Sequence, residues 1–111
     1  MRTKRYLRLN FLNPTWHRGM NTTVRRGDKW FLRAGTDDSV SIHQTGEDEA
    51  IAMGTVVSTR YCDFGEVTLR DLWEHHDREC GTPQGLLHVM VQSYPGFKSD
   101  ESVTVIRFEV E

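Results

Sequence analysis

Basic, amide, hydroxyl and aromatic side chains occur close together in the first third of the chain, a combination suited to an RNA or nucleotide ligand. Guanidinium and ammonium groups bind phosphate, amides and hydroxyls pair with base edges, and aromatic rings stack on bases for about 1–3 kcal/mol each. A Trp in so small a domain is also a natural core residue, so each ring has a structural alternative. The residues that carry this hypothesis, with one ring from further along the chain, are Asn21, Thr23, Arg25, Arg26, Lys29, Trp30, Trp16 and Tyr61.

A second group of reactive side chains forms the run EHHDREC at residues 74–80. His76 and Cys80 are four residues apart, which places two side chains on one face of a helix, where they could bind zinc together with Cys62 and a carboxylate. The chain has no Cys-x-x-Cys pair and no second pair of ligands. We therefore interpret the run as polar residues at a helix end, predict no metal and no cofactor, and expect both cysteines to be reduced thiols.

Alternation of apolar and polar side chains predicts several strands, separated by turns rich in Gly, Asn and Asp. A short helical turn is predicted at residues 14–19, where Pro comes first and Gly last. The polar residues 44–49 are typical of a hairpin tip. The predicted strands are residues 6–11, 22–25, 30–32, 39–42, 51–61 and 103–110.

Two helices are predicted between the last two strands. Thr68 is a suitable N-cap with Asp71 as its capping-box acid, and the apolar stripe that follows includes Trp73, which we expect in the core. The second helix is expected to begin at Thr82-Pro83 and to end at Tyr94. The order of elements predicts an α+β fold, a small and mostly antiparallel barrel or curled sheet with two or three short helices.

The totals fit one intracellular domain spanning residues 1–111. The chain is 37% hydrophobic and 27% charged, which is ordinary for a globular protein. No stretch approaches the roughly 20 apolar residues that a membrane span requires. The basic N-terminus continues into an alternating strand pattern rather than the apolar segment of an export signal, so we expect a cytoplasmic location and no membrane partner.

Charge is segregated along the chain. Nine of the 14 Lys and Arg residues precede Ala34, where Asp28 is the only acid, so this part carries +8 (9 − 1) and the remainder −10 (5 − 15). Such a distribution can create a local positive field on a protein whose net charge is −2. The alternative is that the basic side chains point in different directions after folding.

Three segments together resemble the activating signal cointegrator homology (ASCH) domain of the PUA-like β-barrels. They are GMNTTVRR at residues 19–26, the strand-to-helix passage 51–74, and YPG at 94–96 followed by VTVIRF at 103–108. The resemblance covers roughly residues 13–109. It implies a PUA-like barrel with a cleft, and a function connected with RNA or with modified nucleosides.

One bacterial branch of this family consists of small hydrolases that remove an acyl group from modified cytidine. Its pattern is Gly-x-Lys-Thr-x-Thr-x-Arg, with a glutamate near the start of the second helix. Here the lysine is absent in either alignment, and we prefer the one that matches Thr23-Val24-Arg25 to the end of the pattern. Counting back from residues 94–96 places Glu79 where the glutamate is expected.

These residues lead to two hypotheses for one cleft. The first is a binding module for RNA, a nucleotide or a modified nucleoside. The second is a small amidohydrolase or ribonuclease with Glu79 as acid or base, Thr23 as a donor, and Lys29 in place of the missing lysine. Both require that Asn21, Thr23 and Arg25, which alternate along a strand, face Glu79 across a hollow.

Overall fold

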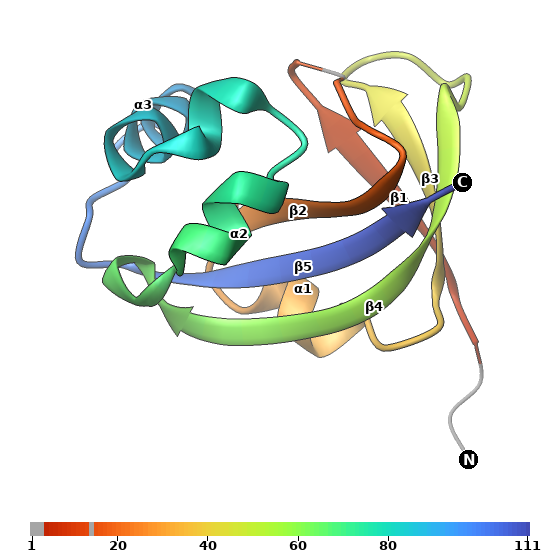
Figure 1. Cartoon of the computed structure of the whole chain (residues 1–111), viewed down its shortest axis with the longest axis horizontal. Coiled ribbons are helices and arrows are strands. Elements are labelled where there is room, and N and C mark those ends of the chain that lie inside the picture. Colours follow the sequence, from red (N-terminus) through yellow and green to blue (C-terminus); the bar gives the residue numbers. More distant parts are fainter. Residues whose placement is uncertain (1–3, 14) are drawn as a thin grey trace.

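The computed structural model describes residues 4–13 and 15–111 of the chain. These residues form an α+β fold, as predicted, with one five-stranded sheet, three α-helices and two 3-10 helices (Figure 1). The strands are β1 (Tyr6–Phe11), β2 (Gly19–Arg26), β3 (Ser39–Gln44), β4 (Ala52–Asp63) and β5 (Ser102–Val110). The helices are α1 (Lys29–Arg33), η1 (Phe64–Glu66), α2 (Leu69–Glu74), η2 (Arg78–Gly81) and α3 (Pro83–Ser93).

The sheet is mixed and mostly antiparallel. Its strand order is β1-β3-β4-β5-β2, and β1 pairs with β3 in parallel while the other neighbours are antiparallel. The long strands β4 and β5 cross the whole molecule, and a register shift between Val56 and Ser58 interrupts their pairing. Such an irregularity increases the twist of a sheet, which here curls so that β1 and β3 stand beside the end of β5 (Figure 1).

The two faces of the sheet bury separate cores because side chains alternate along each strand. On β5, Val103 and Val105 pack with the layer that contains α2 and α3, whereas Ile106, Phe108 and Val110 pack inside the curl with β1 and β3. Residue 24 of β2 belongs to the helical side, so residues 23 and 25 face the inside of the curl.

Helices α2 and α3 begin where the sequence predicted. The Thr68 hydroxyl accepts the N–H of Asp71 at 3.1 Å, and the Asp71 carboxylate accepts the N–H of Thr68 at 2.9 Å, which completes the capping box. Thr82 caps α3 by accepting the N–H of Gly85 at 3.0 Å, with Pro83 in the first turn. These local hydrogen bonds fix the start of each helix over the sheet.

The sheet is not closed by backbone pairing in the part of the chain that the structure describes. Strands β1 and β2 are its two edges, and neither pairs with the other. On the outer side of β2, a single bridge joins Thr22 to His75, and the His76 N–H donates to the Thr22 carbonyl at 3.0 Å. The opening between β1 and β2 is therefore covered only in part.

Three predictions about local structure were wrong. Residues 30–32 belong to helix α1 instead of a strand, because the chain turns at Gly27 (φ 73°) and needs a compact crossing from β2 to β3. Trp73 is 89% exposed, since the buried side of the short helix α2 carries Asp71 and Leu72 instead. Residues 15–19 form no helical turn; Pro14, the first residue of that prediction, lies outside the described residues.

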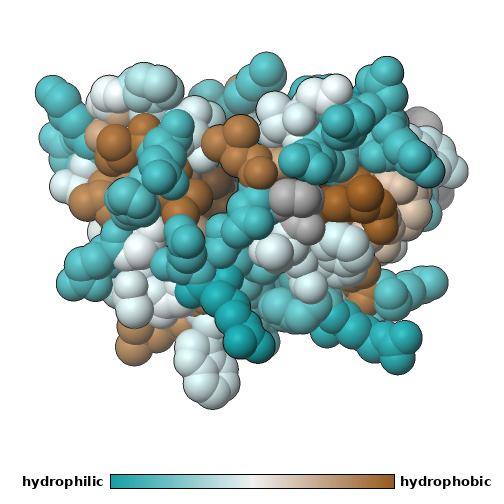
Figure 2. Space-filling model, turned by 90° about the horizontal axis from the view of Figure 1, so that it is seen from above, coloured by the Kyte–Doolittle hydropathy of each residue, from teal (hydrophilic) through white to brown (hydrophobic). Residues whose placement is uncertain are grey.

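No α-helix among the described residues has the length and apolar character needed to cross a bilayer. The face seen from above mixes hydrophilic and hydrophobic side chains over both its helical half and its strand half (Figure 2). That face therefore presents no single continuous hydrophobic surface.

Candidate functional site

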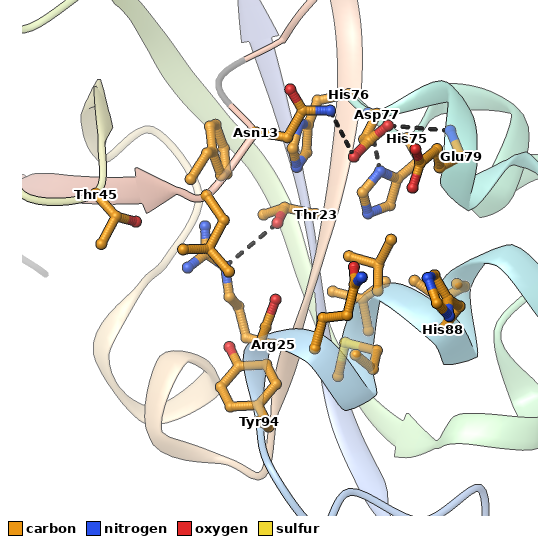
Figure 3. A pocket seen from close by; sticks show the side chains of 18 of the residues that line it. Asn13, Thr23, Arg25, Thr45, His75, His76, Asp77, Glu79, His88 and Tyr94 are labelled. Atoms are coloured by element: carbon orange, nitrogen blue, oxygen red, sulfur yellow. Dashed lines mark hydrogen bonds between the residues drawn. The ribbon is translucent and has the colours of Figure 1, made fainter.

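A pocket of about 550 Å³ lies at the opening between the two edge strands. Its walls come from the end of β1 and the residues after it, from β2, from the segment between α2 and η2, and from the second half of α3 (Figure 3). This volume is within the range of roughly 300–1,000 Å³ typical of small-molecule sites. The polar side chains that line it are Asn10, Asn13, Thr23, Arg25, Thr45, His75, His76, Asp77, Glu79, His88, Gln92, Ser93 and Tyr94.

Strand β2 brings two of the three predicted side chains into this pocket. Thr23 and Arg25 both line it and point to the same side of the strand. Asn21 shares that side by alternation but is completely buried, with 0% exposure. Its side-chain oxygen accepts the His17 N–H at 3.0 Å, and its amide donates to the Gly19 carbonyl at 3.1 Å. Asn21 therefore closes the turn before β2 and does not line the pocket.

Arg25 is a half-buried cation that has no counter-ion in the part of the chain that the structure describes. Its Nη1 donates to the Asn10 carbonyl at 3.1 Å and its Nε to the Thr23 hydroxyl at 3.3 Å, while Nη2 is buried without a hydrogen-bond partner. No carboxylate of residues 4–13 or 15–111 forms an ion pair with it. Burial lowers the pKa of Arg25, and the nearby Tyr94 phenol offsets this only in part.

Two aromatic rings lie beside this guanidinium. Its central carbon lies 5.1 Å from the centroid of Phe11 and 5.8 Å from that of Trp30. Such cation–π contacts favour the charge but do not use its N–H donors. Of the five N–H groups of Arg25, those at Nη2 therefore have no partner among the described residues, and this atom is buried in the present arrangement of side chains.

Two adjacent histidines form the wall beside β2. His75 and His76 are both buried, and their rings stack with centroids 4.5 Å apart. His76 also stacks on Phe11 at 4.0 Å. Burial lowers the pKa of His75 well below its usual range, with a further contribution from His76, and burial lowers the pKa of His76 to about 4. Both imidazoles are therefore neutral at pH 7.

The two carboxylates of the pocket have different surroundings. Asp77 is buried, and its oxygens accept the Asn13 amide at 3.1 Å and the Glu79 N–H at 3.0 Å, so it holds the turn together. Glu79 is exposed where it lines the pocket. Its backbone position is fixed by Gly85, where an added Cβ would overlap the Glu79 carbonyl oxygen. Thr23, Arg25 and Glu79 thus line one pocket.

The other predicted binding residues lie elsewhere. Arg26 is exposed and forms an ion pair with Glu101, with its Nε donating at 2.6 Å. Lys29 is exposed at the start of α1, and Tyr61 is exposed beside Phe31, with ring centroids 6.0 Å apart. Trp30 does not line the pocket, but it packs against the core and touches Arg25, which does.

Metal-binding and thiol chemistry find no support in the described residues. No group of three His, Cys, Asp or Glu side chains there is arranged to hold a metal ion. Cys62 and Cys80 are both free, and Cys80 is buried with its pKa raised to about 12, mainly by burial. A thiol protonated at neutral pH is a poor nucleophile.

Sequence reasoning did not identify His75, Asn13 or Tyr94 as pocket residues. Two histidines directly after a short helix were a usable signal, but the hypotheses for this run concerned zinc binding by His76 and Cys80 and the role of Glu79. Asn13 and Tyr94 reach the pocket because β1 and α3 converge on it, which no local pattern indicates.

Comparison of the chain with models of protein families, with curated proteins and with solved structures gave no match.

Proposed function

We propose that the chain is an ASCH-type domain, with the curled sheet as its PUA-like barrel, and that its pocket binds a nucleotide or a modified nucleoside. The supporting observation is the half-buried Arg25, whose Nη2 is buried without a partner and whose charge has no counter-ion among the described residues. An unpaired buried charge is costly. A ligand whose electronegative oxygen reaches this donor, once the side chains that cover Nη2 move aside, removes part of that cost.

The form of the pocket favours a single nucleotide unit over an RNA strand. Proteins that hold single strands use an extended basic groove lined by aromatic platforms. Here the nearest basic neighbours of Arg25 on the chain lie outside the pocket, and Arg26 is already paired with Glu101. A compact ligand can instead place an oxygen at Arg25 and Thr23 and its amino or imino groups toward Glu79, which is an acceptor.

Hydrolysis is the second candidate function, and one observation favours it. Glu79 and Thr23 line the same pocket, so a carboxylate and a hydroxyl face a common ligand. Glu79 would activate water for attack on an acyl group, while Arg25 and Thr23 would donate to the developing oxyanion. Binding comes first because the buried donors are in place, whereas Glu79 lies at the exposed rim.

A thermal-unfolding panel tests the proposal. The ligands are the common nucleoside 5′-monophosphates, their nucleosides, N4-acylated cytidine and a short RNA. A ligand at a hundred times its dissociation constant adds about 2.7 kcal/mol to the stability, a shift readily detected.

The matched variants are Arg25→Gln and Arg26→Gln, which remove the same charge from neighbouring positions inside and outside the pocket. Binding should disappear only in the first. If no member of the panel stabilises the protein, or if the two variants weaken binding equally, the pocket is not the site. Product formation from the acylated cytidine, lost in Glu79→Gln, would establish hydrolysis.

A further inference from the structure

The two pocket histidines are locked in opposite tautomers by their neighbours. The backbone N–H of Asp77 donates to Nδ1 of His75 at 3.0 Å, so this nitrogen carries no proton and the neutral ring must carry its proton on Nε2. Nδ1 of His76 lies 2.9 Å from the Thr15 carbonyl, which can only accept, so here the proton is on Nδ1. His75 therefore has an N–H donor at Nε2, and His76 does not.

The Nε2–H donor of His75 is unused within the described part of the chain. None of the hydrogen bonds there involves this atom, and it is not among the buried side-chain atoms that are sealed without a partner. Because the ring is buried and lines the pocket, the atom is reached from the pocket side (Figure 3). A donor in this position can form a hydrogen bond to a ligand in the pocket.

Three donors line one part of the pocket, two of them from β2 and the third from the segment after α2. Thr23 lies between Arg25 and His75 in Figure 3, and the backbone bridge between Thr22 and His75 keeps the imidazole next to β2. The Thr23 oxygen already accepts a hydrogen bond from Nε of Arg25, which leaves its own O–H to donate. One cation and two neutral donors can together satisfy several oxygens of one anionic group.

We propose that His75 is a ligand-binding residue, and that with Arg25 and Thr23 it binds the phosphate group of a nucleotide. This inference rests on the proposed function and narrows it to nucleotides over nucleosides. A phosphate has enough terminal oxygens for three donors, whereas a lone carbonyl oxygen has two lone pairs. The phosphate can be bound without a second cation, because the neutral imidazole of His75 also donates a hydrogen bond.

Two substitutions separate the roles of the two ring nitrogens. In His75→Asn, the short amide can accept the Asp77 N–H as Nδ1 does but does not reach the position of Nε2. In His75→Gln, the longer amide reaches that position as a donor but loses the bond to Asp77. If the role of His75 is structural, His75→Gln should be the damaging substitution. If its role is to bind a ligand, His75→Asn should be the one that weakens binding.

The measurement is the dissociation constant of a nucleoside 5′-monophosphate, of the same nucleoside and of inorganic phosphate, alongside the urea midpoint of each variant. We expect tighter binding of the monophosphate than of the nucleoside. His75→Asn should weaken the monophosphate roughly tenfold and leave the nucleoside nearly unchanged, because one hydrogen bond to a charged group is lost. His75→Gln should recover binding to within about threefold while lowering the urea midpoint.

The outcomes distinguish this inference from the function on which it rests. If the wild-type protein binds the nucleoside as tightly as its monophosphate, or if His75→Asn binds the monophosphate normally, the role of His75 is refuted and the pocket function stands. If neither ligand binds, both fail. Long-range ¹H–¹⁵N spectra supply a test without ligand, since a proton on Nδ1 of His75 would overturn the assignment.

Discussion

Mild acid is expected to destabilise the protein because it forces protons onto the buried histidine pair. The pKa of His76 is about 4 in the folded chain, compared with an ordinary value of 6.5, and that of His75 is also lowered. The unfolded chain therefore binds more protons than the folded chain between these values. Stability is fully present above about pH 6.5 and is lost as the pH falls toward 4.

The size of the loss follows from the shift of His76. The pKa of His76 is 6.5 in the unfolded chain and about 4 in the folded chain, so lowering the pH from about 7 to about 4.5 reduces the free energy of unfolding by roughly 2 kcal/mol. His75 adds to the loss in the same direction. For a domain whose total stability is about 5–15 kcal/mol, this is a large fraction.

The buried carboxylate of Asp71 acts at lower pH and does not confuse the measurement. Its burial raises the pKa, but hydrogen bonds from Arg60 and Thr68 outweigh this and leave the pKa below its ordinary value of 3.8. Stability that depends on this group is present above 3.8 and is lost only as the pH falls below it. The range from 6.5 to 4 therefore reports mainly on the histidines.

Urea unfolding followed by circular dichroism at several pH values measures the effect. His76→Gln removes the titrating ring, and its free energy of unfolding should depend less on pH by about 2 kcal/mol over the range. His88→Gln is the matched control, because His88 lines the same pocket from the exposed side of α3. A wild-type loss below about 1 kcal/mol, or an equal pH dependence in His76→Gln, would refute the reasoning.

Three further substitutions test the fold around the site. Gly85→Ala should destabilise the protein by more than about 2 kcal/mol in urea unfolding, because its Cβ would overlap the Glu79 carbonyl oxygen. Gly81→Ala is the control and should cost little, because the space around Gly81 is open. Equal effects of the two substitutions would contradict the close packing of η2 on α3. Thr68→Ala should cost about 1 kcal/mol by the same assay through loss of the cap, and an unchanged stability would mean that the capping box is not formed in solution. Trp73→Ser should change stability by less than about 0.5 kcal/mol and remove the tryptophan fluorescence most accessible to iodide, and a large loss would return this ring to the core.

Local signals in the sequence were enough to predict most elements of the fold. The strand at residues 6–11 has the predicted bounds, and Thr68 and Thr82 cap the helices as expected. These features depend on a few neighbouring residues, such as a hydroxyl that accepts an N–H three positions later. The prediction for Trp73 was wrong because the spacing of apolar residues shows which of them lie on the same face of a helix. It does not show whether that face packs against the sheet.

Only the site residues that alternate along strand β2 could be predicted from the sequence. Thr23 and Arg25 share a side of β2 and line one pocket, as alternation requires, whereas Asn21 is taken up by the turn before the strand. Trp30 was expected in an extended segment after Gly27, and Lys29 was assigned on the condition that the turn at Gly27 folds it back toward the cleft. Helix α1 follows that turn instead, and neither residue lines the pocket. Which side chains meet across a pocket depends on long-range packing that no local pattern contains.

The position of the pocket follows from the way the sheet ends. Edge strands leave backbone groups unpaired, and proteins cover them with side chains or with other segments. Here β2 is covered at Thr22 by the backbone of residues 75–76, while the guanidinium of Arg25 reaches across to the Asn10 carbonyl on β1. Continuous pairing of β1 with β2 would have filled this opening with a ladder of hydrogen bonds. Because β1 and β2 do not pair within the described residues, side chains lie in the gap, and the groups that cover the edges are the ones that we propose bind a ligand.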